Sequence, residues 1–172
     1  MWSHDFWGSR LDSPKSHNSW RPLTSLSFAL QSTGNLDKLG DLATLHLFNI
    51  VLHGLNVCLF RRLIRAQFAS STVSFLSLLF AAHPLASEAV CSLVGRADLF
   101  HQLCLLSSLL MMRSNLQQRA IYSSIICAIS VLFKETGLVT FPIVAFVDLA
   151  AKRTFKQSQV WPLSTHQRRR QI

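Results

Sequence analysis

The chain has 172 residues, of which 49% are hydrophobic and only 15% are charged. Lys and Arg outnumber Asp and Glu by 17 to 8, which gives a net charge of +9. The basic residues gather at the ends of long apolar runs, and no aromatic and basic recognition motif accompanies them. This distribution argues against nucleic-acid binding and is typical of a membrane protein, whose loops carry the Lys and Arg residues.

The cysteines give no sign of a metal site. They are scattered, with no CxxC pair and no His at ligand spacing, and most lie inside apolar runs, as Cys104 does. We therefore expect small buried side chains, and neither a metal nor a cofactor. Met1 is followed by polar and aromatic residues, without the basic and apolar regions of a signal peptide.

Residues 2–22 combine Trp2, Trp7 and Trp20 with several charged residues. One interpretation is an aromatic anchor at the membrane surface, where Trp is enriched. The other is an ordered substrate loop, and both remain open. The short apolar stretch 23–30 follows, and then a turn-rich connector over 31–41. We assign 1–41 to a luminal loop and entry segment.

Five apolar runs predict an all-α, polytopic transmembrane bundle over residues 42–151. The predicted spans are 42–60, 68–82, 99–112, 120–133 and 138–151. The second is only about 22 Å long as a helix, so it crosses a bilayer only if the helix continues into His83–Pro84 or the bilayer thins. Residues 152–172 are basic and polar, and we expect a disordered cytoplasmic tail.

The first span carries a polar stripe. His46, Asn49, His53 and Asn56 follow one another at steps of three and four, which places them on one helical face. The two histidines lie about 10 Å apart along the axis, too far for one metal ion. We predict that the stripe points into the bundle and forms interhelical hydrogen bonds.

The charged clusters sort by side when the spans alternate across a membrane. The basic clusters fall on one side, which the positive-inside rule makes cytoplasmic, and the mixed acid and base clusters fall on the luminal side. The basic clusters are Arg61, Arg62 and Arg65, then Arg113 and Arg119, then Lys152, Arg153 and Lys156. Five spans place the N-terminus outside the cytoplasm, so we expect a further helix upstream and a longer parent protein.

Residues 82–98, AHPLASEAVCSLVGRAD, are the strongest candidate for a functional site. His, Glu, Arg and Asp lie together here between two uncharged apolar runs, which is costly unless they line a polar cavity or lie at a membrane surface. We expect a loop that forms half of an active-site mouth. Carboxylates serve as general bases and Arg clamps phosphate, so the chemistry suits group transfer from a lipid phosphate. The alternative is that Glu88, Arg96 and Asp98 pair with one another to fix the loop.

Several motifs occur together in one family. They are HDFWGSR, SHNSWRPLTSLSF, LHLFNIVLHGLN, FAAHPLASEAVCSLVGRADL and LFKETGLV. With them the chain resembles the transmembrane and tetratricopeptide-repeat O-mannosyltransferases, membrane proteins of the C-type glycosyltransferase fold. The resemblance implies a multi-pass protein of the endoplasmic reticulum membrane. It further implies transfer of mannose from dolichyl phosphate mannose to Ser or Thr of secretory-pathway proteins such as cadherins.

The resemblance also suggests roles for single residues. Glu88 and Asp98 would be catalytic, and Arg21 and Arg96 would bind the donor phosphate. The supporting luminal cluster would comprise Asp5, His83, Lys134 and Glu135. The family's acidic pair, thought to supply the catalytic base, and its repeat domain are absent here, so we expect this chain to be a fragment. The alternative from another class is a non-catalytic membrane scaffold or assembly subunit that keeps the fold.

Overall fold

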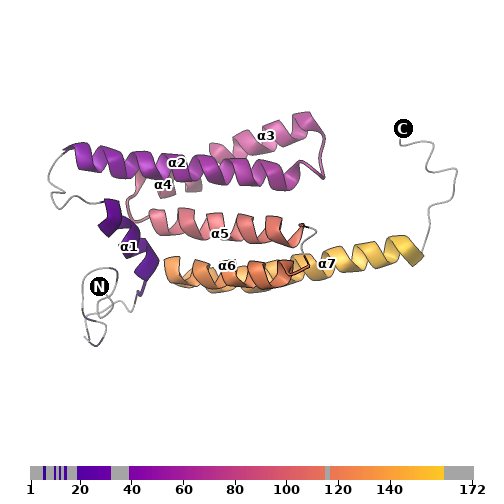
Figure 1. The fold of residues 1–172 in the computed structure, drawn as a ribbon. Coiled ribbons are helices and arrows are strands. Elements are labelled where there is room, and N and C mark those ends of the chain that lie inside the picture. Colours follow the sequence, from indigo (N-terminus) through magenta and orange to yellow (C-terminus); the bar gives the residue numbers. More distant parts are fainter. Residues whose placement is uncertain are drawn as a thin grey trace.

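The computed structural model describes residues 19–31, 39–114 and 117–160, together with Phe6, Arg10, Asp12 and Pro14; for 39–41 and 151–160 only the helical backbone is described. Every regular element in these ranges is a helix, which confirms the predicted all-α class (Figure 1). The elements are α1 (Pro22–Gln31), α2 (Leu39–Ile64), α3 (Ser70–Ala81), α4 (Pro84–Cys91), α5 (Arg96–Met112), α6 (Arg119–Phe133), the 3₁₀ helix η1 (Glu135–Val139) and α7 (Thr140–Val160).

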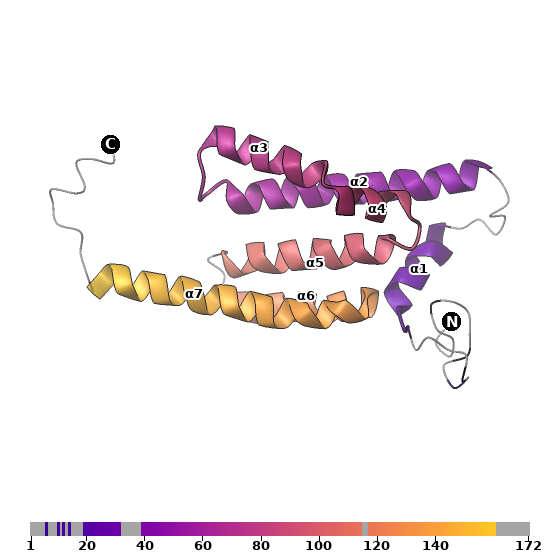
Figure 2. The same cartoon turned by 180° about the vertical axis from the view of Figure 1, so that it is seen from behind.

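The long helices run back and forth, so their ends gather at two ends of a bundle. Helix α5 lies between α2 on one side and α6 on the other, as both views show (Figures 1 and 2). We call one end the polar end: it holds α1, α4, η1 and the start of α5. We call the opposite end the basic end: there α2 passes into α3, and α5 passes towards α6.

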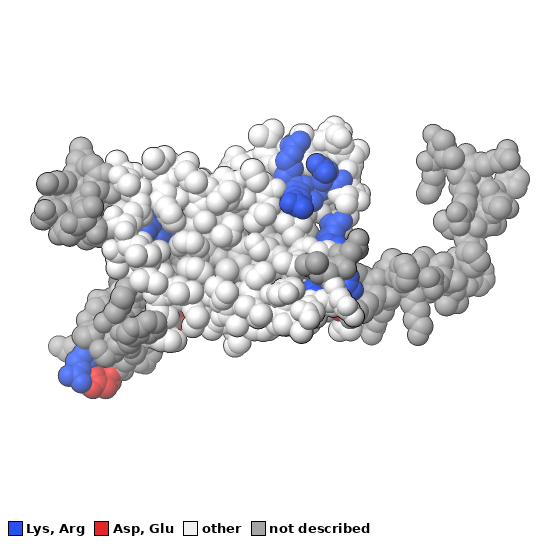
Figure 3. All heavy atoms as spheres, viewed as in Figure 1, with Lys and Arg blue, Asp and Glu red and all other residues white. Residues whose placement is uncertain are grey.

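The expected segregation of charge is present along this bundle. Arg61, Arg62 and Arg65 are exposed at the basic end, and Arg113 Nη1 donates to the Leu63 carbonyl at the same end. On the face that Figure 3 shows, Lys and Arg gather there, while residues without charge cover most of the bundle. Cations near the last turn of α2 also compensate the partial negative charge of its carbonyl end.

Two predicted boundaries differ from the structure. The loop expected over 82–98 is wrong, because most of it folds into α4 and the first turn of α5. Pro84 occupies the first turn of α4, where its missing amide hydrogen breaks no helical bond, and His83 Nδ1 accepts from the Leu85 amide as a cap. At the other boundary, α7 continues through Val160, so the helix includes the start of the expected tail; residues 161–172 lie outside the described part.

Helices α3 and α4 together form one bent apolar segment, with an angle of 47° between them. The bend frees the Ala81 carbonyl, and His53 Nε2 lies 3.1 Å from that oxygen. Because a carbonyl only accepts, Nε2 must carry the proton. His53 thus donates a hydrogen bond to the carbonyl that the bend leaves without a helical partner. Side chains of neighbouring helices commonly satisfy such carbonyls where a helix is interrupted in apolar surroundings.

Helix length and composition identify candidate membrane spans among the described residues. Leu42–Ile64 within α2 is long and apolar enough to cross a bilayer alone, and the bent α3–α4 pair qualifies if it counts as one span. Helix α6 is apolar but shorter. These observations give one or two candidates by length, against five predicted from the sequence.

The predicted polar stripe on α2 is confirmed for Asn49, His53 and Asn56, whereas His46 is only half-buried. Asn49 and Asn56 are completely buried. Asn56 Nδ2 donates to the Leu99 carbonyl at 3.0 Å, and Asn49 Nδ2 donates to the Ser92 carbonyl at 3.2 Å. Both bonds join α2 to the α4–α5 region, so the stripe fixes the helices that carry the candidate site.

Candidate functional site

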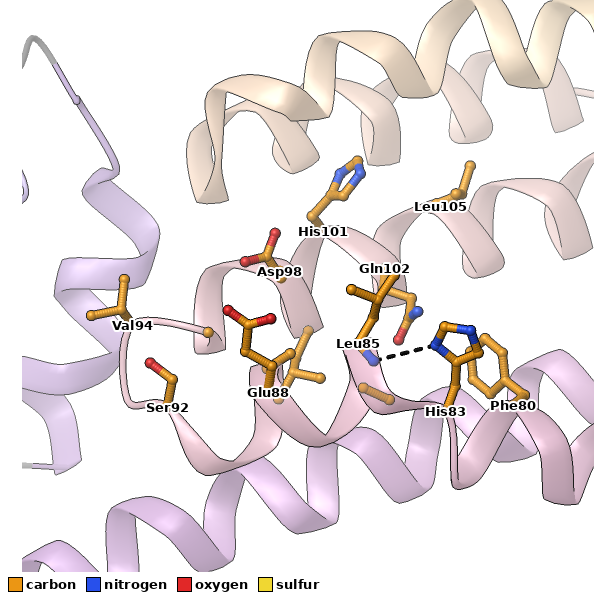
Figure 4. Close-up of a pocket in the computed structure, with 14 residues that line it drawn as sticks. Phe80, His83, Leu85, Glu88, Ser92, Val94, Asp98, His101, Gln102 and Leu105 are labelled. Carbon is orange, nitrogen blue, oxygen red and sulfur yellow. Dashed lines mark hydrogen bonds between the residues drawn. The ribbon is translucent and has the colours of Figure 1, made fainter.

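A cavity of about 620 Å³ opens at the polar end, between the α3–α4 segment and α5. It brings together three of the predicted site residues, His83, Glu88 and Asp98 (Figure 4). His101 joins them from the next turn of α5. The remaining lining residues are Phe80, Leu85, Ala86, Ala89, Ser92, Val94, Gly95, Leu99, Gln102 and Leu105.

The two carboxylates of the cavity differ in their partners. Asp98 forms an ion pair with Lys134, which follows α6. Glu88 is exposed on α4, and within the described ranges its carboxylate has no hydrogen-bond or ion-pair partner. The expected alternative, in which Glu88, Arg96 and Asp98 pair with one another, is therefore not what the fold shows. Of the two carboxylates, Asp98 is therefore the one held by an ion pair.

Arg96 lies in the interior and does not line the cavity. Its Nε donates to Asn49 Oδ1 and its Nη2 to the Leu45 carbonyl, each at 3.0 Å. The guanidinium carbon lies 4.1 Å from the ring centroid of Phe28 and 4.7 Å from that of Phe48. These contacts join α5 to α1 and α2, so Arg96 positions the helices around the site. We call this arrangement the Arg96 cage.

Arg21 and Glu135 form a second polar cluster beside the cavity. Arg21 Nε lies 3.1 Å from Glu135 Oε2, and Ser19 Oγ donates to Oε1 at 2.8 Å. Burial alone would raise the pKa of Glu135, but hydrogen bonds from its own backbone amide, Ser19 and Arg21 outweigh it and lower the pKa. The carboxylate therefore stays charged and ties the start of α1 to η1.

The glycines of the GRAD and KETG motifs allow close helix contacts around these clusters. A Cβ at Gly95 would lie 2.3 Å from the Ala89 carbonyl oxygen, and one at Gly137 would lie 2.4 Å from the carbonyl carbon of Ser130. Both clashes are with backbone, which cannot move aside as a side chain can. The motifs thus set the distances between α4 and α5 and between η1 and α6.

The structure describes only part of the charged N-terminal segment. Asp5 lies outside the described residues, and Arg10 is exposed and paired with Asp12 at 2.9 Å, without contact to the cavity. In the ranges that the structure covers, no group of three or more His, Cys, Asp or Glu side chains is arranged to hold a metal ion. The polar end thus offers carboxylates, histidines and one half-buried arginine.

His101 is a site residue that the sequence analysis missed. Its Nδ1 lies 2.9 Å from Ser130 Oγ on α6. Asp98, His101, Gln102 and Leu105 follow at steps of three, one and three, which places all four on one helical face. The predicted span began at residue 99, whereas α5 begins at Arg96. With the observed start, the helical spacing from Asp98 identifies His101 as a residue on the same face.

The fold and site together define an all-helical chain with a polar cavity at one end of a largely apolar bundle. Comparison with known proteins adds a family. Protein O-mannosyl-transferase tmtc2 of Xenopus laevis is 37% identical over 92% of this chain and 20% of its own length. TMTC2 of Mus musculus is 35% identical over 94% of this chain and 21% of its own length. TMTC4 of Homo sapiens is 35% identical over 87% of this chain and 23% of its own length.

The chain belongs to this family of TMTC protein O-mannosyl-transferases. It spans about a fifth of the length of the curated relatives that it matches. No protein-family profile matches the chain, and no solved structure does either.

Proposed function

We propose that this chain forms part of the membrane domain of a protein O-mannosyltransferase and that the cavity between α4 and α5 belongs to the transfer site. One observation carries the proposal: a polar cavity opens at one end of an apolar bundle whose opposite end is basic, and one carboxylate of this cavity, Glu88, has no partner among the described residues. The names of the relatives support the reaction type.

The membrane placement rests on the outer faces of the helices. Large apolar side chains point outwards around the bundle, among them Leu47 (59% exposed), Leu78 (70%) and Phe146 (72%). Soluble monomers rarely leave such continuous apolar surface uncovered, whereas lipid would cover it. The proposed arrangement is a multi-pass bundle of the C-type glycosyltransferase fold in the endoplasmic reticulum membrane, with the polar end towards the lumen.

The proposed reaction uses dolichyl phosphate mannose as donor and a Ser or Thr hydroxyl of a secretory-pathway protein, such as a cadherin, as acceptor. The hydroxyl oxygen attacks the anomeric carbon of mannose. The bond from that carbon to the phosphate oxygen breaks, and the lipid phosphate keeps the electron pair. Glu88 takes the hydroxyl proton as general base, while Asp98, held by Lys134, contributes a second acceptor in the cavity.

The donor phosphate needs a cation, and Arg21 is the better placed of the two predicted ones. Its side chain is 14% exposed at the polar end, just before α1, and its pairing with Glu135 leaves other guanidinium hydrogens for a phosphate. Arg96 could bind the phosphate as predicted only if it gave up its hydrogen bonds to Asn49 and the Leu45 carbonyl in the Arg96 cage. Both assignments remain predictions.

A non-catalytic scaffold remains the second candidate, because one set of observations favours it. Arg21, Arg96 and Lys134 all have protein partners, which is what a purely structural polar network requires. On this account Glu88 would be a surface carboxylate without consequence. The two candidates therefore differ most at Glu88.

Glu88→Gln is expected to reduce mannosyl transfer by about a hundredfold or more in the full-length protein, since loss of a general base typically costs 10²–10⁴-fold. The measurement is transfer from dolichyl phosphate mannose to an acceptor peptide, at matched protein abundance. The control is Ser87→Ala, which changes an exposed neighbour on α4 outside the cavity. Wild-type transfer by Glu88→Gln would contradict the role of Glu88 as the base, and absence of transfer by the wild-type protein itself would favour the scaffold.

A further inference from the structure

The geometry points to His101 as a substrate-positioning residue, one that presents its Nε2–H to the cavity and donates a hydrogen bond to a hydroxyl oxygen of the sugar. This inference deepens the proposed function and rests on it. It concerns a side chain that the family motifs do not include, since it follows the GRAD motif by three residues.

The ring of His101 is anchored at one nitrogen only. Nδ1 lies 2.9 Å from Ser130 Oγ, and within the described ranges Nε2 has no protein partner. His101 is half-buried and lines the cavity, so its second nitrogen is available to a molecule bound there. A ring fixed at Nδ1 is oriented before the substrate arrives, as a positioning group requires.

Ser130 also determines which nitrogen carries the proton. This serine is completely buried, and its hydroxyl hydrogen needs an acceptor. His101 Nδ1 is the partner that the described residues give to Ser130 Oγ, so the hydroxyl donates and Nδ1 accepts. A neutral imidazole that accepts at Nδ1 carries its hydrogen on Nε2. His101 therefore offers a donor to the cavity and not a base.

The lining of the cavity matches a sugar better than a phosphate. None of the residues that line it is Lys or Arg, and its charged groups are the carboxylates of Glu88 and Asp98. Lys134 compensates the charge of Asp98, which leaves the carboxylate of Glu88 to repel the donor phosphate. By contrast, a carboxylate and an N–H donor one helical turn apart complement neighbouring sugar hydroxyls, which both donate and accept. Figure 4 shows Asp98 and His101 projecting from the same side of α5.

The test compares His101→Phe, which removes the donor, with His101→Gln, whose amide restores one. In the full-length protein we expect His101→Phe to raise the donor KM about tenfold, as loss of one hydrogen bond to substrate does. We expect His101→Gln to recover most of that loss. Leu103→Met, a half-buried position on the same helix outside the cavity lining, serves as the control for altered packing.

Donors that lack single mannose hydroxyls identify the partner of Nε2. One such deoxy donor should bind the wild-type protein more weakly than the complete donor does. His101→Phe should bind the two donors equally well, because the variant and the deoxy donor remove the same hydrogen bond. Ser130→Ala removes the hydrogen bond that orients the His101 ring but keeps the ring itself. It should raise the donor KM less than His101→Phe does, and through the same mannose hydroxyl. This variant keeps the test available if His101→Phe does not accumulate.

Two outcomes would overturn the inference. One is that His101→Phe has the same donor KM as the wild type while Glu88→Gln is inactive. This result would contradict the role of His101 but not the proposed function. The other is strict additivity between His101→Phe and every deoxy donor, which would reduce His101 to a packing residue. If Glu88→Gln is fully active, the proposed assignment of the cavity to the transfer site fails, whatever His101 does.

Discussion

Gly95→Ala and Gly137→Ala are expected to reduce the amount of folded protein severely, whereas Gly54→Ala is expected to have little effect. A Cβ at Gly95 or Gly137 would lie 2.3 or 2.4 Å from backbone atoms of a neighbouring helix, while none lies within 4 Å of a Cβ at Gly54. Overpacking typically costs about 1–3 kcal/mol, and a backbone clash falls at or above the top of that range. Ala in place of an exposed helical Gly gains up to about 1 kcal/mol.

The measurement is thermal unfolding of the full-length variants in detergent, together with their abundance in membranes. Gly54→Ala is the matched control, because it makes the same chemical change in α2 without a clash. Equal melting temperatures for Gly95→Ala and wild type would contradict the close contact between α4 and α5.

Arg96→Leu is expected to destabilise the protein by about 3 kcal/mol or more. The substitution removes hydrogen bonds from a buried cation, each worth about 1.5–3 kcal/mol, and leaves Asn49 Oδ1 without a donor. It also removes the stacking of the guanidinium on Phe28 and Phe48, worth up to about 2 kcal/mol for a desolvated pair. Unfolding in detergent is the measurement, and exposed Arg62→Leu is the control.

A double-mutant cycle separates the structural role of Arg96 from phosphate binding. Asn49→Leu and Arg96→Leu should be non-additive, since they share one hydrogen bond. If Arg96→Leu instead melts like wild type but no longer binds dolichyl phosphate mannose, the original assignment of Arg96 to the donor phosphate is right and the structural one is wrong.

The regular part of the fold was predictable because its signals are local. The spacing of Asn49 and Asn56 placed both on one face of α2, and both are buried there. Residues 82–98, by contrast, were predicted as a loop, although Pro84 within them occupies the first turn of a helix, where a proline breaks no hydrogen bond. Short helices after a bend have too few residues to show a period, so α4 had no local signal.

The site was predictable in residue types but not in pairings. Arg21 and Glu135 are 114 positions apart, and Asp98 and Lys134 are 36 apart. Only the fold sets such distances. The sequence therefore left open whether Arg96 and Asp98 pair with each other, whereas the helix turns Arg96 into the interior and Asp98 towards the cavity. If the helical spacing had been continued from Asp98 along α5, His101 would have been predicted on the same face.

The central claim is that the cavity lies at the luminal end of a membrane-embedded bundle, and accessibility of single cysteines tests it most directly. Ser87→Cys on α4 and Gln67→Cys between α2 and α3 are both at exposed positions, at the polar and basic ends respectively. Each is introduced into the full-length protein after its native cysteines are replaced, and sealed microsomes are treated with a membrane-impermeant maleimide. We expect Gln67→Cys to react in intact microsomes and Ser87→Cys only after permeabilisation; reaction of both from the same side would contradict the account.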